Sequence, residues 1–334
     1  MMLVRCDATA DIGFGHLSRC IALAEALRLS RVECGFVGML DDAAEHQLAL
    51  AGFEFTSLAD PLGSKSAKEE LVGLSADCVI LDSYRADESY LADLKALGLA
   101  LVVIDDFRLL PAYPCDVILN FTWEAPSLGY PSGPALLLGP HHLLTRRRLV
   151  EQRKLSVERS RQGQVENLLV AVGGSDPKGI TARLLRVLEG VGRDIHLRTI
   201  SGDPDQLAPL LSSFAEGSEA LPRQPDLSKH LLWADAALTG GGLIKYEAAY
   251  MGVPAAAIAQ NAGQDGETQV FAKAGLVFDL GLADSISDAE LAVSLDRFLS
   301  DAPLRETMAN RMQDAFIPDP SAHAAKAILE AIGH

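Results

Sequence analysis

Short apolar runs alternate with amphipathic stretches along almost the whole chain. In the first half the apolar runs predict buried strands at Met2–Cys6, Glu33–Val37, Phe53–Ser57, Cys78–Asp82, Leu101–Asp105 and Val117–Asn120. Stretches with helical periodicity lie between them, such as Leu17–Arg28 and Asp87–Lys95, where Leu91 and Leu94 face inward. Continuous apolar strands joined by helices indicate a parallel sheet that is covered on both faces.

This pattern stops in a Pro/Gly-rich passage at residues 126–140, and a polar, basic stretch at residues 145–164 follows it. The strand-and-helix alternation then restarts. Strands are predicted at Asn167–Val172, His196–Ile200, Ala236–Thr239, Ala255–Ala259 and Val277–Asp279, and helices at Ile180–Glu189, Leu243–Met251, Asp265–Ala274, Asp288–Leu299 and Ala322–Ile332.

Two successive doubly wound α/β domains of Rossmann type, facing a central cleft, explain the chain. We predict an N-terminal domain at residues 1–145, a linker at 146–164 and a C-terminal domain at 165–334. Whether the last helix crosses back to the first domain is left open. Arg146, Arg147 and Arg148 are interpreted as a solvated face of the linker.

Composition and charge narrow the class of partner. The 334 residues are 49% hydrophobic and 22% charged, enough apolar material for two cores, and the formal net charge is −16. So acidic a surface argues against general binding to nucleic acid or to membranes. The five cysteines form no CxxC pair, and neither a signal peptide nor a long apolar run is present, so we expect a cytoplasmic protein with reduced thiols. The sequence indicates no oligomeric state.

The loop after the first predicted strand begins at Asp7 and contains Gly13, Gly15, His16 and Arg19. Two glycines allow a sharp turn close to a ligand, and the start of the following helix favours a negative charge. Ser18 stands where a dinucleotide fingerprint would have its third glycine. We therefore expect a site for a substrate anion rather than a dinucleotide cofactor.

Two interpretations of His16 stand side by side. A helix N-terminus disfavours the imidazolium form, which would leave His16 neutral and able to accept a proton. The alternative is a histidine that only caps or packs at the turn. Arg19 could bind a phosphate, but pairing with a carboxylate such as Asp7 is the favoured interpretation.

Two further glycine-containing loops follow predicted strands of the second half. One contains Gly173, Gly174 and Ser175, and the other contains Gly241, Gly242 and Leu243. Such loops bring backbone N–H groups up to an anion, although glycines are also ordinary turn formers. Glu247, in the helix after the second loop, is a candidate to accept the hydroxyl groups of a ribose.

Other polar residues carry weaker signals. Asp82, Asp105 and Asp106 end strands, where a position facing the cleft and a helix N-cap are both possible and the N-cap is favoured. His141 and His142 have no partner at metal-binding spacing. The chain has no GxSxG, HExxH or GxxxxGK[ST] motif, so we expect neither a metal nor another cofactor.

Taken together, these residues resemble the PseG/SpsG proteins, nucleotide-sugar hydrolases of glycosyltransferase-B (GT-B) fold that are related in architecture to MurG. The resemblance spans roughly positions 3–280. It rests on Asp7, the Ile12–His16 run, Arg19, Cys20, Asp82, Ser83, Tyr84, Asp105, Asp106, Asn120, Gly139, Leu144, Arg146, Gly173–Asp176, Glu247 and Gln264. The stretch IGFGHxxRC is its most specific part.

The resemblance implies hydrolysis of UDP-2,4-diacetamido-2,4,6-trideoxy-β-L-altropyranose to UDP and free sugar, on the route to pseudaminic acid. His16 would activate a water that attacks the anomeric carbon with inversion. Tyr84, Asp82, Asn261 and Gln264 would contact the substrate, and the C-terminal loops would hold UDP. The chain departs from the family at Gly263, where an asparagine usually precedes the glutamine; Asn261 lies two positions earlier.

Two other functions use the same features. One is a GT-B glycosyltransferase that moves the sugar to an acceptor. The acidic chain shows no apolar or basic patch for a membrane-bound acceptor, which favours the hydrolase. The other is a non-catalytic sugar-nucleotide binding protein, which would have no reason to place a neutral histidine beside the anomeric carbon.

Overall fold

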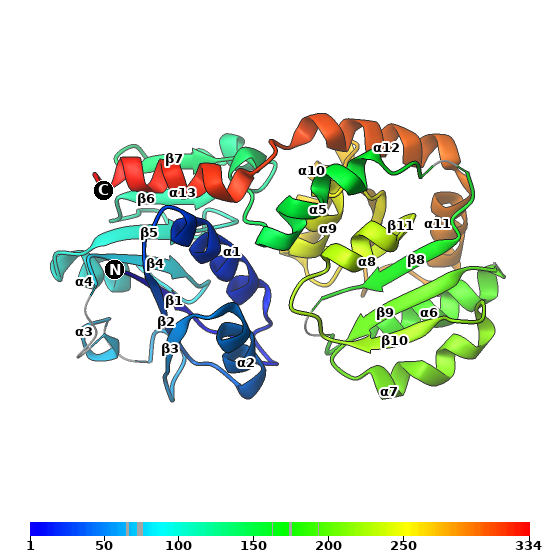
Figure 1. Cartoon of the computed structure of the whole chain (residues 1–334), viewed down its shortest axis with the longest axis horizontal. Helices are drawn as coiled ribbons and strands as arrows, with labels where there is room; N and C mark the ends of the chain where they lie inside the picture. The colour runs from blue at the N-terminus through cyan, green and yellow to red at the C-terminus, as the bar shows by residue number, and fades with distance from the viewer. Residues whose placement is uncertain (65–66, 72–75, 162, 174–175, 193) are drawn as a thin grey trace. The chain divides into compact units, whose positions relative to one another are not determined.

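The structure is a computed structural model that describes residues 1–64, 67–71, 76–161, 163–173, 176–192 and 194–334. The chain divides into two compact units (Figure 1). Unit 1 comprises Met1–Arg147 together with Asp319–His334, and unit 2 comprises Arg148–Pro318. Each unit is a parallel sheet covered by helices, which confirms the predicted α/β class with two doubly wound sheets.

Unit 1 is built on a seven-stranded sheet of order β3-β2-β1-β4-β5-β6-β7, in which every neighbouring pair is parallel. Its strands are β1 (Met2–Cys6), β2 (Cys34–Gly38), β3 (Glu54–Ser57), β4 (Cys78–Asp82), β5 (Ala100–Ile104), β6 (Val117–Asn120) and β7 (Ala135–Leu138). Its helices are α1 (Gly15–Leu29), α2 (Asp42–Ala51), α3 (Ala67–Glu70), α4 (Glu88–Ala96) and α13 (Pro320–Ala331), with short 3₁₀ turns η1 (Ala125–Ser127) and η2 (Pro140–His142).

Unit 2 contains a six-stranded parallel sheet of order β10-β9-β8-β11-β12-β13. Its strands are β8 (Asn167–Ala171), β9 (His196–Ser201), β10 (Glu219–Pro222), β11 (Ala236–Gly240), β12 (Ala255–Ala259) and β13 (Phe278–Leu282). Its helices are α5 (Arg147–Glu158), α6 (Ile180–Val191), α7 (Pro204–Leu207), α8 (Ser228–Trp233), α9 (Leu243–Tyr250), α10 (Ala262–Lys273), α11 (Asp288–Ser300) and α12 (Ala302–Ala315), with the 3₁₀ turn η3 (Ala208–Ser213).

Several elements lie where the sequence pattern predicted none, among them two strands and the helices α5, α8 and α12. Strand β7 falls in the Pro/Gly-rich passage and β10 falls in an interval without a strand prediction. Both are four-residue strands at a sheet edge and are only partly buried. The sequence of β7 is an apolar run enclosed between Pro134 and Gly139, whereas β10 mixes polar and apolar residues. Helix α5 occupies most of the segment predicted as a linker. Its sequence is so rich in charged residues that apolar positions at helical spacing do not stand out.

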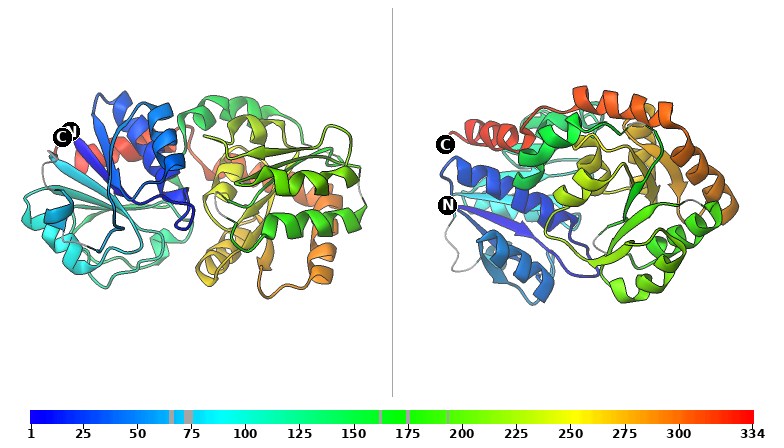
Figure 2. Two further views of the ribbon diagram at one scale, coloured as in Figure 1. Left: turned by 90° about the horizontal axis from the view of Figure 1, so that it is seen from below. Right: turned by 45° about the vertical axis from the view of Figure 1, so that its right-hand side comes forward.

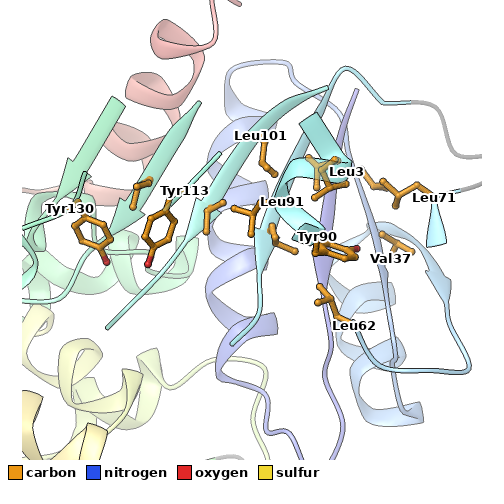
Figure 3. Close-up of a cluster of buried hydrophobic side chains, with 14 residues drawn as sticks. Leu3, Val37, Leu62, Leu71, Tyr90, Leu91, Leu101, Tyr113 and Tyr130 are labelled. Carbon is orange, nitrogen blue, oxygen red and sulfur yellow. The ribbon is translucent and has the colours of Figure 1, made fainter. Parts of the chain in front are cut away.

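The core of unit 1 includes a cluster of buried side chains between one face of the sheet and α4 (Figure 3). Leu91 and Leu94 of α4 are fully buried there, which confirms the inward face predicted for this helix. They pack among strand residues such as Leu3 and Leu101. Burying a leucine contributes about 1.5–3 kcal/mol, so this face alone is a strong reason for the helix to dock.

The C-terminal helix α13 belongs to unit 1, where it contacts α1 and β7. Ser321, in its first turn, accepts a hydrogen bond from the Thr145 backbone N–H at 2.8 Å and donates to the Thr145 carbonyl at 2.9 Å. Figure 2 shows both chain ends close together in this unit. Within the described ranges, no helix combines the length and the apolar character needed to cross a bilayer.

Candidate functional site

The central strands of unit 1 carry polar residues at their carboxyl ends. In the order β1-β4-β5-β6, the loop after β1 leads to His16, β4 ends at Asp82, Asp106 follows β5 and β6 ends at Asn120. Ligands of open parallel sheets bind outside this edge. Neighbouring strands therefore bring together residues that are distant in the sequence, such as Arg19 and Asp106, which are 87 positions apart.

His16 lies in the first turn of α1 and is tied to the end of β4. The loop turns at Gly13, whose φ of 92° favours glycine, and α1 begins at Gly15 after Phe14, which provides no side-chain cap. The His16 Nδ1 is 2.6 Å from Asp82 Oδ1. An ionised carboxylate can only accept, so Nδ1 is the donor in this contact, and in the neutral imidazole Nε2 then carries the lone pair.

Arg19, one turn further along α1, holds two carboxylates. Its Nε and Nη2 donate to the two oxygens of Asp82, each at 2.6 Å, and its Nη1 donates to both oxygens of Asp106 at 2.7 Å. All three residues are at most 6% exposed. Burial tends to raise the pKa of Asp82, but the charges of Arg19 and then His16 outweigh it and hold that pKa well below its ordinary value. Asp82 is therefore ionised at neutral pH.

Tyr84 also contacts the imidazole of His16. Its hydroxyl donates to Asp106 Oδ2, and its ring meets the His16 ring edge-on, with centroids 4.6 Å apart at 74°. Burial of the hydroxyl and the negative charge of Asp106 raise the pKa of Tyr84 far above its usual value. The residue as a whole is 48% exposed, so its ring also presents an accessible aromatic surface beside His16.

Several predictions about these carboxylates were wrong. Asp82 and Asp106 are not N-caps but the two partners of Arg19. Asp105 also does not cap a helix: it accepts hydrogen bonds from the hydroxyls of Tyr113 and Tyr130. The pairings of Asp82 and Asp106 with Arg19 join segments distant in sequence, and local spacing carries no signal for them.

Arg19 pairs with carboxylates, as the sequence favoured, but Asp7, the example named, is not one of its partners. Asp7 Oδ1 is 2.5 Å from Arg5 Nη1, and the two oxygens of Asp7 also accept the backbone N–H groups of Met39 and Leu62 at 2.9 and 2.8 Å. Asp7 is 4% exposed. These contacts tie β1 to two neighbouring loops, and a contact of Asp7 with substrate stays a prediction.

In unit 2, the loop after β11 is packed tightly against neighbouring backbone. A Cβ atom added to Gly240 would lie 2.0 Å from the Val172 carbonyl oxygen, and one added to Gly241 would lie 2.9 Å from Gln264 Cβ. Glycine is therefore required here by close approach. Gly242 precedes Leu243, the first residue of α9, and provides no side-chain cap. Gly173 ends the described part of the other loop, and Gly174 and Ser175 lie outside the described residues.

Below this loop lies a buried charge cluster that the sequence reasoning missed. Lys245 Nζ contacts a Glu267 carboxylate oxygen and donates to the Gly241 carbonyl, and the Tyr246 hydroxyl donates to Glu267. Lys245 is 1% exposed and Glu267 is 4% exposed. Glu247, the predicted ribose acceptor, is in the same helix and is also buried. The sequence signal for this cluster was a lysine three residues after a glycine run, early in a predicted helix. A lysine buried at such a position needs an acidic partner.

Asn261 and Gln264 form the start of α10. Asn261 is its N-cap, with Oδ1 accepting the Gln264 backbone N–H at 3.0 Å, and Gln264 Oε1 accepts the Gln260 N–H at 3.0 Å. Their side-chain oxygens thus have local structural tasks. The substrate contacts predicted for them stay predictions.

The basic segment near residue 145 is solvated only in part: the Arg148 side chain is 72% exposed, as expected, whereas Arg146 makes an internal contact. Arg146, expected to be solvated, donates to Glu25 of α1 at 3.0 Å and its side chain is only 11% exposed. His142 stacks on His323 of α13, with centroids 5.0 Å apart. In the part of the chain that the structure describes, no group of three or more histidine, cysteine or acidic side chains is arranged to hold a metal ion.

Comparison with known proteins supports the fold and indicates distant relatives. No protein-family model matches the chain. It is 24% identical to the uncharacterized protein MJ1062 of Methanocaldococcus jannaschii over 76% of this chain, and it spans about half, 54%, of that protein's length. It is 23% identical to the spore coat polysaccharide biosynthesis protein SpsG of Bacillus subtilis, over 90% of this chain and 89% of SpsG.

Solved structures of similar architecture cover nearly the whole chain. They include MurG of Acinetobacter baumannii (TM-score 0.67, 15% identity, 98% of this chain and 99% of that one) and the spinosyn forosaminyltransferase SpnP (0.65, 13%, 99% of each). LpCGTa in complex with UDP is a third (0.65, 14%, 100% of this chain and 99% of that one). The chain therefore has the GT-B fold, with two parallel-sheet α/β domains, and its sequence is similar to that of SpsG.

Proposed function

We propose that the chain hydrolyses a UDP-linked 2,4-diacetamido-2,4,6-trideoxy sugar to UDP and free sugar, in biosynthesis of a pseudaminic acid-type sugar. The observation that carries the proposal is the pairing of His16 Nδ1 with the buried Asp82 carboxylate, which leaves Nε2 able to accept a proton. A base of this kind at the carboxyl edge of the first sheet suits attack by an oxygen nucleophile.

In the proposed reaction, His16 Nε2 removes a proton from a water molecule as the water oxygen bonds to the anomeric carbon. The bond between that carbon and the UDP oxygen breaks, UDP leaves from the opposite face, and the anomeric configuration inverts. His16 is then an imidazolium ion beside the ionised Asp82, which stabilises the new positive charge. The imidazolium afterwards releases its proton to solvent.

The other half of the substrate is assigned to unit 2. Gly173, Gly241, Gly242 and Leu243 would bring backbone N–H groups to the diphosphate, and Glu247 would accept the ribose hydroxyls. Support comes from the polysaccharide-biosynthesis relative SpsG and from the UDP bound to LpCGTa, a protein of the same fold. Tyr84, with its exposed ring beside His16, is proposed to pack against the sugar.

A glycosyltransferase is the second candidate, and the likeness to the forosaminyltransferase SpnP favours it. The same base would then take the proton of an acceptor hydroxyl instead of water. Both reactions break the same bond and need the same pairing of His16 with Asp82. They differ only in the nucleophile, so the experiment must follow the oxygen atom.

The test is incubation of the purified protein with the UDP-linked sugar in ¹⁸O-water, followed by mass spectrometry and by NMR of the first anomer formed. Hydrolysis by the proposed route places ¹⁸O in the sugar and none in UDP. His16→Ala should lower kcat about 10²–10⁴-fold with little change in UDP affinity by calorimetry. His46→Ala, an exposed histidine of α2, is the matched control. Label in UDP, or full activity of His16→Ala, would reject this mechanism.

A further inference from the structure

The imidazole of His16 is held between two side chains that a second layer of residues fixes in turn. Asp82 contacts its Nδ1, and Tyr84 meets its ring edge-on. Asp82 is gripped by Arg19 through two hydrogen bonds, and Tyr84 is anchored by its hydroxyl to Asp106. Arg19 and Asp106 are themselves joined at 2.7 Å. Together with His16, these four residues form a closed ring of contacts, and Arg19 Nη2 also lies 3.2 Å from His16 Nδ1.

The side chains of this ring carry one more negative charge than positive charge when His16 is neutral. The charged groups are two carboxylates and one guanidinium. Protonation of His16 brings the group to neutrality. Because Arg19, Asp82 and Asp106 are almost fully buried, solvent screens these charges little. A positive charge formed on the imidazole during the proposed reaction is therefore balanced by this group.

The contacts also require the shape of arginine. One guanidinium donates from Nε and Nη2 to Asp82 and from Nη1 to Asp106 at the same time. A planar fork with fixed donor directions can hold both carboxylates in a defined orientation, whereas the single ammonium of lysine cannot. The direction in which Asp82 Oδ1 faces His16 is thus set by Arg19.

We propose that Arg19 and Asp106 are positioning residues that keep His16 in the tautomer with a bare Nε2 and hold its ring in one orientation. The effect on rate rests on the proposed function, but the tautomer is a property of the free protein. Asp106 acts through both neighbours of the imidazole, since it binds Arg19 on one side and Tyr84 on the other.

The test is ¹⁵N NMR of the histidine side chains in the full chain without ligand, with the His16 signals identified by their loss in His16→Ala. The unmodified protein should show one tautomer, protonated at Nδ1. Asp106→Asn, which preserves shape but removes the charge, should show a mixture of both tautomers. With the sugar nucleotide, kcat should fall about tenfold while KM stays within about twofold. Arg19→Lys should act in the same direction, although it keeps the charge.

Asp105→Asn is the matched control, because the neighbouring Asp105 is equally buried but bonds Tyr113 and Tyr130 instead of the ring around His16. It should lower stability without changing the His16 tautomer. A single unchanged tautomer in Asp106→Asn would overturn the proposal, and this variant decides alone if Arg19→Lys does not fold. A tautomer change in a protein that hydrolyses no UDP-sugar would keep the positioning role and reject the proposed function.

Discussion

Replacing Asp82 by asparagine removes one negative charge from the centre of the candidate site and leaves its shape almost unchanged. The carboxylate accepts from His16 at 2.6 Å and from Arg19 twice at 2.6 Å. An asparagine can turn its amide N–H₂ toward His16 Nδ1. The imidazole proton would then move to Nε2, the atom proposed to act as the base.

The expected loss in rate follows from these contacts. In the proposed transition state the imidazolium of His16 lies against the Asp82 carboxylate. Two unit charges about 4 Å apart attract by about 4 kcal/mol at an effective dielectric constant of about 20. Loss of that attraction corresponds to about 10³-fold in kcat, and the wrong tautomer brings the expected loss to about 10³–10⁴-fold. KM should change little, because the effect arises as charge develops.

The assay is steady-state UDP release from the sugar nucleotide that the unmodified protein turns over, with circular dichroism to confirm folding. Breaking a buried ion pair costs about 3–5 kcal/mol, so Asp82→Asn should also unfold at lower denaturant concentration. Asp105→Asn controls for that loss. A folded Asp82→Asn protein with kcat within threefold of the unmodified protein would refute the role of the pair.

Because the pKa of Asp82 is lowered, its contribution to stability is present at neutral pH and is lost only in acid, as the pH falls through that lowered pKa.

Three further predictions concern unit 2. Glu247→Ala should weaken UDP binding about tenfold in calorimetry, since it removes a charged acceptor, and an unchanged affinity would contradict the ribose assignment. Glu267→Gln should lower the free energy of unfolding in denaturant by about 3–5 kcal/mol, because the buried Lys245 ammonium loses the Glu267 carboxylate. Adding Lys245→Met to this variant should restore part of that loss, and a double variant no more stable than the single one would argue against the pairing. Burial, with the charges of Lys229 and Arg198, lowers the pKa of His230 to about 4, below its ordinary value, so the folded protein should lose on the order of 3 kcal/mol as the pH falls from about 6.5 to about 4. His230→Phe should unfold with a smaller acid dependence, and an equal dependence in both proteins would show that other groups cause it.

Much of the fold follows from local pattern. Strands β1, β4, β6 and β12 begin and end where the apolar runs predict, because an inner strand of a parallel sheet is buried on both faces and its sequence shows this directly. The strands β7 and β10 escaped prediction, β7 because it lies within a Pro/Gly-rich passage and β10 because its short sequence is not a continuous apolar run. The glycines at Gly13 and Gly241 were also readable, because backbone turns and close approach demand them.

The sequence by itself determined the two-domain α/β class and singled out His16 in its loop, because strand burial, helix period and turn chemistry are local. Only the tertiary structure decided what His16 contacts. Asp82 and Asp106 lie about 60 and 90 positions from Arg19 and look like ordinary strand-end carboxylates until β4 and β5 are paired beside β1. The same holds for Lys245 and Glu267, which belong to different helices. Such pairings depend on strand order, and strand order is set by the packing of the whole domain rather than by any one segment.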